Sequence, residues 1–397
     1  MKLLRTLSLP RLLVLVAVVA AIAVGGTALA VAARGGGPTP PAKPLAQEIH
    51  DSLAAPEAAG ITARIKFTNK LFPSGALEGR VGSALMSGAD GRLWLTNDGR
   101  GRLELQSSAG DVQIVWNKQR VTLYDASSNT VYSRDLPALA HKADQAQEPK
   151  STGPSLADIR DFLARIGKRA DVSGARPTNI AGREAYSVSL SPKHDGGLLG
   201  SLQLAWDAAH GVPLRVAIYA RGASSPVLAL EATDISYGPV PSANVDISPP
   251  ADAKKSSIGQ AAPTQKEHGQ KERRHDLRVD TLSSVQAQAG FKLVAPDALV
   301  GLPRKAVQLV GGHDSKTVLL VYGQGLGAIV VAESTGDSSA NQGPLSSLPK
   351  VSLDGATGHE LSTQLGTVLS WRRNGVAYVL AGSLPSAAAE AAARSLK

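Results

Sequence analysis

The chain has 397 residues, with 42 Lys and Arg against 33 Asp and Glu, and no cysteine. The absence of cysteine excludes disulfides, thiolate metal sites and cysteine nucleophiles, and the length allows two domains with substantial cores. Of the net charge of +9, residues 1–34 supply +4 and the rest is distributed over the remaining chain, and aromatic residues make up only 4% of the sequence. Because basic and aromatic residues do not interleave, we expect no nucleic-acid partner.

The first residues have the pattern of an export segment. A basic start precedes an apolar run from Leu12 to Ala33 that has no polar face, which is typical of a Sec-type signal and keeps positive charge on the cytoplasmic side. The run is long enough to span a bilayer, whereas Ala28-Leu29-Ala30 fits a cleavage site. We expect an extracytoplasmic protein, anchored in the cell membrane by residues 1–34 with its C-terminus outside, or secreted if cleaved after Ala30. The basic residues are Lys2, Arg5 and Arg11.

Composition divides the rest of the chain into two predicted domains. Residues 35–44 are rich in Gly and Pro and predict a tether. Residues 45–250 predict a β-rich domain. Apolar residues become rare and charges frequent in residues 251–276, which predicts a linker. Residues 277–397 predict a smaller α+β domain.

The first domain begins with a predicted helix and continues mainly as strands. Residues Leu45–Ala54 predict that helix, and Ser155 with Asp158 resembles a capping box for another helix that ends near Lys168. Period-2 alternation of apolar residues predicts the strands. About ten strands and two or three helices predict an α+β fold, with an antiparallel sheet and helices packed on one face. The predicted strands are Ile61–Thr68, Gly91–Leu95, Gly101–Gln106, Asp111–Trp116, Arg120–Asp125, Thr130–Ser133, Glu184–Leu190, Ser201–Trp206, Leu214–Tyr219 and Leu228–Tyr237.

The second domain contains a glycine-rich stretch, Tyr322–Gly327, that resembles a phosphate-binding loop. A dinucleotide loop leads into a helix, but the residues after this stretch are strand-like. We therefore predict two strands joined by a turn with positive φ. The predicted elements of this domain are the helices Thr281–Ala289 and Ser386–Leu396 and the strands Val307–Leu309, Thr317–Tyr322, Ala328–Glu333, Thr367–Arg372 and Val376–Ala381.

Residues with the chemistry of an active site are few. Histidines stand beside acidic residues at three places, but none has the spacing of zinc ligands, and no Gly-x-Ser-x-Gly elbow occurs. We predict a non-enzymatic protein with no catalytic residue, no metal ion and no cofactor. The three pairs are His194-Asp195, His313-Asp314 and His359-Glu360.

Amphipathic strands are the feature that recurs. Their alternating apolar residues indicate one wide apolar sheet face, which has two interpretations. Either helices cover the face and it is core, or part of it stays uncovered and forms an apolar groove for a ligand. The candidate ligand-binding residues are Leu93, Leu95, Leu103, Leu105, Ile114, Trp116, Val121, Leu123, Leu204, Trp206, Val216 and Ile218.

The stretch Asp111–Ser133 resembles the central hairpins of the LolA-type lipoprotein-carrier family. It combines a polar turn, an apolar strand, Tyr-Asp, and a second polar turn with Asn before Val. Together with further similar segments, the resemblance spans most of Gln47–Pro250. The matching positions of the hairpins are Asn117, Tyr124, Asp125, Asn129 and Val131, and the further segments are Ile180–Tyr186, Leu190–Pro192, Trp206-Asp207 with Gly211–Leu214, Tyr237-Gly238, and Ile247–Pro250.

The second domain is similar to a domain of exported actinobacterial proteins. There it follows a LolA-like domain or an anti-sigma-factor region. The similar segments are Leu320–Val330 and Trp371–Leu380. This second resemblance implies little about what the domain does.

The LolA-like resemblance implies both a fold and a function. The fold is an unclosed antiparallel β-barrel, a half-barrel with helices on its concave face. The function is non-enzymatic binding of the acyl chains of a lipid or lipoprotein in the cell envelope. The alternative is an RseB-like extracytoplasmic sensor that regulates a membrane anti-sigma factor, or another membrane signalling partner, by protein–protein contact.

Overall fold

The computed structural model divides into two compact units. The first comprises residues 1–193 and 200–262, and the second comprises residues 194–199 and 263–397. The predicted export segment lies outside the residues that the structure describes. Within those residues, no helix combines the length and the apolar character needed to cross a membrane. The described residues are 37–71, 83–136, 154–168, 170–193, 197–257, 281–310, 316–335 and 348–397.

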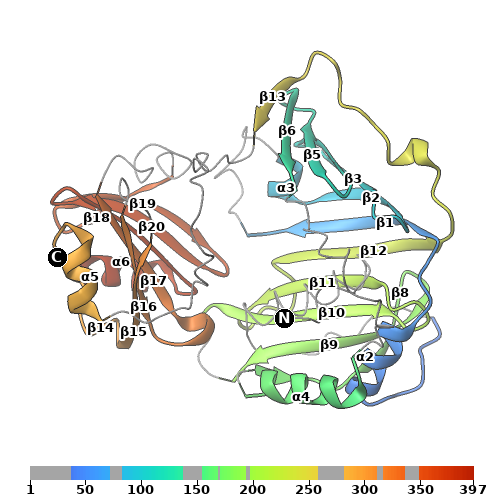
Figure 1. The fold of residues 1–397 in the computed structure, drawn as a ribbon, viewed down its shortest axis with the longest axis horizontal. Coiled ribbons are helices and arrows are strands. Elements are labelled where there is room, and N and C mark those ends of the chain that lie inside the picture. Colours follow the sequence, from blue (N-terminus) through green and yellow to red (C-terminus); the bar gives the residue numbers. More distant parts are fainter. Residues whose placement is uncertain are drawn as a thin grey trace, which may run out of the picture. The chain divides into compact units, whose positions relative to one another are not determined.

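A 13-stranded open sheet forms the body of the first unit (Figure 1). Its order is β13-β6-β5-β4-β3-β2-β1-β12-β11-β10-β9-β7, and β8 pairs with β9. The sheet is mixed, because β13 runs parallel to β6, whereas the sequence predicted antiparallel strands throughout. The strands are β1 (Gly60–Asn69), β2 (Ala89–Thr96), β3 (Gly101–Ser107), β4 (Gly110–Trp116), β5 (Arg120–Asp125), β6 (Thr130–Asp135), β7 (Ala170–Val172), β8 (Arg176–Ile180), β9 (Arg183–Pro192), β10 (Leu199–Asp207), β11 (Pro213–Ala220), β12 (Leu228–Tyr237) and β13 (Lys254–Ser257).

Short polar turns join the strands of the central hairpins, as predicted. Asn117 closes the β4–β5 turn, because its side-chain oxygen accepts hydrogen bonds from the backbone N–H groups of Gln119 and Arg120 at 2.8 and 2.9 Å. Asn129 closes the β5–β6 turn with φ of 45°, a left-handed conformation that Asn tolerates better than most residues. These turns set the register on which the apolar face depends.

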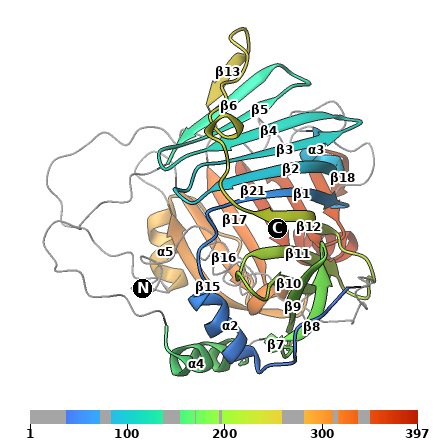
Figure 2. The same ribbon diagram turned by 90° about the vertical axis from the view of Figure 1, so that its right-hand side faces the viewer.

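Two longer helices of the first unit lie together beside β9, at one end of the sheet (Figure 2). They are α2 (Leu45–Ala54) and α4 (Leu156–Ile166). The predicted capping box of α4 is confirmed, since the Ser155 side chain accepts from the Asp158 N–H and the Asp158 carboxylate accepts from the Ser155 N–H. The five-residue α3 (Ser83–Ser87) packs on β1, β3 and β4.

Several short elements were not predicted from the sequence. The strands β8 and β9 form a hairpin whose two turn residues, Ala181 and Gly182, both have positive φ, as in a type I′ turn. Near the start of the predicted linker over residues 251–276, Lys254–Ser257 form β13. This strand needs no apolar residues, since backbone hydrogen bonds to β6 hold it. The rest of that linker, from residue 258, lies outside the described residues.

The second unit contains an 8-stranded antiparallel sheet in the order β14-β15-β16-β17-β21-β20-β19-β18. The predicted turn after Tyr322 is confirmed, because Gly323 and Gly325 have φ of 78° and 62° and the strand β17 follows. Helix α5 packs on β15 and β16, and α6 packs on β18, β20 and β21. The elements are α5 (Leu282–Ala289), β14 (Ala298–Leu299), β15 (Leu302–Val310), β16 (Thr317–Tyr322), η3 (Gly325–Gly327), β17 (Ile329–Thr335), β18 (Lys350–Leu353), β19 (Ala356–Thr363), β20 (Gly366–Arg373), β21 (Val376–Gly382) and α6 (Ser386–Ser395).

Candidate functional site

Strand register places the eight candidate residues of β2–β5 on one face of the large sheet. Residues directly opposite one another in neighbouring antiparallel strands point to the same face, so the pairings can be followed from β2 to β5. We call this surface the apolar face, and it also includes Phe67 of β1 and Leu230 of β12, which are paired with each other. One row is Leu93, Leu103, Ile114 and Leu123, and the remaining members are Leu95, Leu105, Trp116 and Val121.

The apolar face is only partly covered. Leu95 and Leu105 are buried. The other six candidate residues on β2–β5 are half-buried, and Leu230 of β12 is 40% exposed. A sheet face that served only as core would be covered by a second layer. Here a run of large apolar side chains keeps part of its surface accessible.

A glycine shapes the apolar face at β3. Gly101 lies opposite Trp116, and a Cβ atom at Gly101 would overlap the Trp116 indole. The indole therefore lies directly over the backbone of the neighbouring strand, which a residue with a side chain would prevent. The result is a flat aromatic surface at this end of the face.

The other four candidate residues belong to a separate cluster beneath α2 and α4. Leu204 and Trp206 are buried there, against Leu45 of α2 and Phe162 of α4. A ligand could not touch them without displacing the helices, so these two side chains are core. Val216 and Ile218 are half-buried at the border of this cluster, and their pairing with Leu230 and Leu228 places them on the same side of the sheet as the apolar face.

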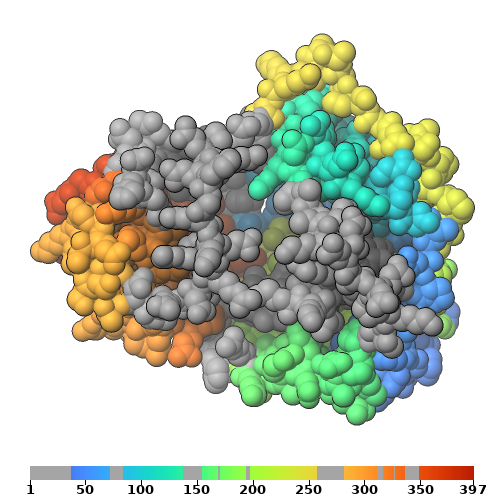
Figure 3. Space-filling model, viewed as in Figure 1, coloured from blue at the N-terminus to red at the C-terminus, as the bar shows by residue number. Residues whose placement is uncertain are grey.

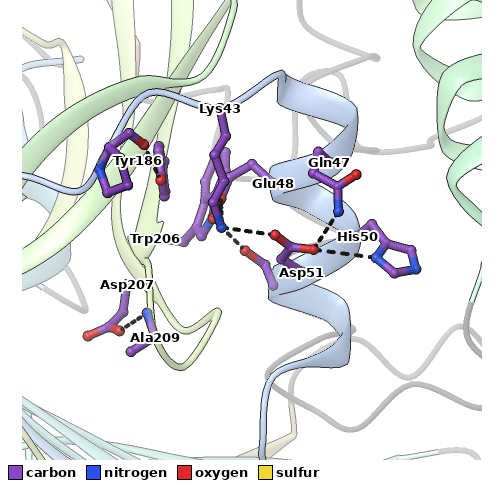
Figure 4. Close-up of polar contacts among 11 residues, drawn as sticks. Lys43, Gln47, Glu48, His50, Asp51, Tyr186, Trp206, Asp207 and Ala209 are labelled. Atoms are coloured by element: carbon purple, nitrogen blue, oxygen red, sulfur yellow. Dashed lines mark hydrogen bonds and ion pairs between the residues drawn. The ribbon is translucent and has the colours of Figure 1, made fainter.

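A buried glutamate fixes α2 to the sheet (Figure 4). Glu48 is fully buried, and its Oε1 accepts a hydrogen bond from Trp206 Nε1 at 3.3 Å. Lys43 Nζ lies 3.8 Å from Glu48 Oε2 and 3.0 Å from Asp51 Oδ2. Burial raises the pKa of Glu48, and the hydrogen bond from Trp206 and the charge of Lys43 counteract part of that rise. This group closes one end of the sheet.

The described part of the predicted tether is docked on the sheet. Asn179 Nδ2 donates to the carbonyl oxygen of Pro38 at 2.9 Å, and the Tyr186 hydroxyl donates to that of Pro41 at 2.6 Å. The Pro40 side chain is buried. Within the predicted tether, the backbone at Pro38 and Pro41 is therefore bound by side chains that stand 141 and 145 residues later in the chain.

A second polar group surrounds Asp207, which is 2% exposed. Its Oδ2 accepts from Arg183 Nε at 3.1 Å and from the Tyr237 hydroxyl at 2.9 Å, and its Oδ1 accepts from the backbone N–H groups of Ala209 and His210. The ring of His210 stacks on that of Tyr237 with centroids 3.9 Å apart. Burial raises the pKa of Asp207, but these four donors outweigh burial and hold it below its usual value.

The Asp207 group fixes the β10–β11 turn to β9 and β12. It pairs all its charges internally, so it offers no free functional group to a ligand. The motif Trp206-Asp207 through Leu214 was recognised in the sequence as a turn, but the role of Asp207 was not. The only available signal was an acidic residue at the end of an apolar strand.

The described residues contain no group of three or more His, Cys, Asp or Glu side chains that could hold a metal ion. Two of the three predicted histidine–acid pairs, at residues 194–195 and 313–314, fall outside the described residues. In the third, His359 Nδ1 lies 3.1 Å from the carbonyl oxygen of Leu348. That contact joins β19 to the segment just before β18 and does not form a catalytic arrangement.

Comparison with known proteins gives matches among solved structures alone. No family model matches the chain, and no curated protein does. The chain is similar to MucB in complex with MucA(peri), at 14% identity and a TM-score of 0.40, over 89% of this chain and 96% of that one. It is also similar to MucB, at 14% identity and a TM-score of 0.35 over 88% and 96% of the two chains.

A further similar structure is a LolA superfamily protein from Nitrosomonas europaea. The identity is 9% and the TM-score 0.21, over 52% of this chain and 99% of that one. These likenesses to MucB and to a LolA superfamily protein concern the fold, at low sequence identity.

Proposed function

We propose that the first unit binds the acyl chains of a lipid or lipoprotein on the apolar face, without catalysing a reaction. The observation that carries this proposal is the row of half-buried leucine and isoleucine side chains across β2–β5. An apolar surface of this extent that is left partly uncovered is typical of an interaction site. The sequence resemblance to the LolA-type family supports the same ligand class.

The apolar face can supply enough free energy for useful affinity. Burial of each methylene contributes about 0.8 kcal/mol, so burial of about ten methylenes contributes roughly 8 kcal/mol, which corresponds to a dissociation constant near 1 μM. A long acyl chain contains more methylenes than that. Because the contribution is non-directional, the face would accept different chain types.

A photo-crosslinking experiment tests the proposal on the full chain in detergent micelles. The probe is a phosphatidylcholine with a diazirine in one acyl chain, and crosslinked peptides are mapped by mass spectrometry. We expect labels in residues 89–125, which include β2–β5. Labelling confined to other parts of the chain, such as residues 1–34, with none in β2–β5, would contradict the proposal.

Two neighbouring residues of β4 provide a matched pair of variants. Ile114 belongs to the apolar face, whereas Val115 is half-buried and points to the opposite face. We expect Ile114→Gln to weaken lipid labelling of β2–β5 about tenfold, because an amide replaces a buried aliphatic group, and Val115→Gln to leave it unchanged. Equal effects of both variants would show that the loss reflects general destabilisation.

Regulation of a membrane signalling partner is the second candidate function. The docking of Pro38 and Pro41 favours it, because an anchored chain without a long free tether is poorly suited to transport. Crosslinking in cells tests this candidate. Recovery of a membrane anti-sigma factor or sensor kinase with the full chain would support it, and a crosslinked fraction without any membrane signalling protein would contradict it.

A further inference from the structure

The apolar face ends in polar side chains at its β6 edge. Val121 of β5 lies opposite Arg134 of β6, and Leu123 lies opposite Tyr132. Arg134 and Tyr132 therefore point to the same side of the sheet as the apolar face. Arg134 is exposed and Tyr132 is half-buried. At this edge, the next residue of the row that runs from Leu93 to Leu123 is Tyr132, and the guanidinium of Arg134 lies beside its phenol ring on the same strand.

The parallel strand β13 adds a second cation to this edge. Its register pairs Lys254 with Thr130 and Ser256 with Tyr132, so both side chains point to the same side as the apolar face. Two contacts hold β13 in this register: the Lys254 N–H donates to the Asn129 carbonyl at 2.9 Å, and Asn129 Nδ2 donates to Asp252 Oδ2 at 3.0 Å. Figure 3 shows this segment, in yellow, against the teal of β5 and β6.

Among the residues that the structure describes, no acidic side chain neutralises either cation of this edge. Asp135 points to the opposite face, where it pairs with Arg120 at 2.7 Å. Asp125 shares the face but is fully buried, and it accepts hydrogen bonds from Ser127 and Ser128. Among the described residues, Arg134 and Lys254 have no ion-pair partner. Two unpaired cations thus stand where a wide apolar surface ends.

We propose that this edge binds the phosphate of an anionic lipid headgroup while the acyl chains of the same lipid lie across β5 to β1. This inference rests on the proposed function and names its ligand class. Arg134 and Lys254 lie on either side of Tyr132, each about 7 Å along the strand direction, which their long side chains can span. A guanidinium binds phosphate through paired hydrogen bonds, and the hydroxyls of Tyr132 and Ser256 can donate to the remaining oxygens.

The dimensions of the sheet suit such a ligand. From β6 to β1 there are five strand spacings, about 24 Å, which is enough for an extended long acyl chain that runs across the strands. The far end of the sheet is covered by α2 and α4 and its buried carboxyl group, Glu48, is fully enclosed there, whereas Arg134 and Lys254 stand exposed at the β6 and β13 edge. The charge therefore favours one orientation, with the headgroup at β6 and β13.

Competition between two lipids with the same acyl chains tests the inference. The full chain in non-ionic micelles is labelled with the diazirine phosphatidylcholine, and unlabelled dioleoyl phosphatidylglycerol or dioleoyl phosphatidylcholine is added. We expect phosphatidylglycerol to compete about tenfold better, the size of one charge-assisted hydrogen bond. Glycerol phosphate, which has no acyl chains, is expected to compete only at millimolar or higher concentrations. Stronger competition by it would assign the edge to a free phosphate compound.

The two lysines of β13 provide a matched control. Lys254 points to the apolar face and Lys255 to the other side. We expect Arg134→Gln and Lys254→Gln each to reduce the preference for phosphatidylglycerol severalfold and the double variant to abolish it, while Lys255→Gln preserves it. Equal competition by both lipids in the wild type, or equal effects of the two lysine variants, would overturn this inference and leave acyl-chain binding intact. Absence of any lipid labelling would instead contradict the proposed function.

Discussion

At the scale of single residues, Glu333 of β17 is the most perturbed carboxyl group of the second unit. It is fully buried, its Oε2 accepts from the Val294 N–H at 3.1 Å, and its Oε1 has no partner among the described residues. Burial raises the pKa of Glu333 to about 7. The hydroxyls of Tyr322 and Tyr378 are the other titratable groups near it, and burial raises the pKa of each to about 12.

This carboxyl group predicts that the stability of the second unit depends on pH. The folded chain holds the Glu333 proton to about pH 7, whereas the unfolded chain loses it near pH 4.5. The free energy of unfolding therefore has its highest value below pH 4.5. It falls as the pH rises to 7, and the total decrease is about 3 kcal/mol. Hydrogen exchange of residues 316–335 between pH 4 and pH 8, corrected for intrinsic rates, measures this change.

The variant Glu333→Gln removes the titration. We expect its stability to be flat over the same pH range, whatever its absolute value, because the amide does not ionise. Asp354→Asn is the matched control, since Asp354 is an exposed carboxylate with φ of 45° that Asn tolerates. A Glu333→Gln protein that keeps the wild-type slope would show that another group is responsible.

At the scale of elements, two helices begin at side-chain caps of the same chemistry. The Ser155 hydroxyl accepts from the Asp158 N–H at 3.2 Å at the start of α4, and the Thr281 hydroxyl accepts from the Ser284 N–H at 3.3 Å at the start of α5. These caps satisfy N–H groups that have no partner inside a helix. Both starts are readable from the sequence, because the capping residue stands directly before an apolar periodic segment.

Removal of either cap is predicted to destabilise only the helix that it begins. We expect Ser155→Ala to destabilise α4 by about 1 kcal/mol, seen as faster hydrogen exchange of residues 156–166, with α5 unchanged. Thr281→Ala is expected to do the reverse, with faster exchange in residues 282–289 and α4 unchanged. The two variants therefore serve as controls for each other. Faster exchange of both helices in either variant would contradict a local effect.

The sequence predicts elements well where a local pattern determines them. Arg120–Asp125 and Leu228–Tyr237 were predicted with the observed bounds of β5 and β12, because alternation and polar turns mark their ends. The three residues of β7 and the four of β13 are too short to show a period, and β13 is held by its backbone. The long β19 was missed because Gly358 and polar residues interrupt its alternation.

The apolar face was predictable in composition but not in extent. Alternation identified the residues from Leu93 to Leu123, since register follows from short hairpins. The burial of Trp206 was not readable, because its partner Glu48 stands 158 positions earlier in the chain. The same holds for the cations beside the face, since only the pairing of β13 with β6 brings Lys254 to that edge.

At the scale of the whole molecule, the segment before α2 is attached to the sheet of the first unit by two hydrogen bonds, from Asn179 to Pro38 and from Tyr186 to Pro41. Both donors are buried or nearly so, so their loss would leave unsatisfied groups. Lys43 adds an ion pair with Asp51 directly before the helix. The segment is thus part of the folded unit.

Removal of these donors is expected to release the segment. In a chain with both Asn179→Ala and Tyr186→Phe, we expect proteinase K to cleave within residues 38–43 about tenfold faster than in the wild type, as for the loss of roughly 1.4 kcal/mol of local protection. Ser187→Ala is the control, because its half-buried β9 side chain donates to the Arg176 carbonyl of β8 and not to residues 38–41. Equal cleavage of the double variant and the wild type would contradict docking.

The docked segment limits how far an anchored form of this protein could travel. If residues 1–34 remain in the membrane, about four residues separate Ala33 from the first bound carbonyl at Pro38, which is at most roughly 15 Å of extended chain. Such a protein could neither rotate freely above the bilayer nor cross the space beyond it. It would sample the lipids of a small membrane area around its own anchor, and delivery to a distant acceptor would require that acceptor to come to it.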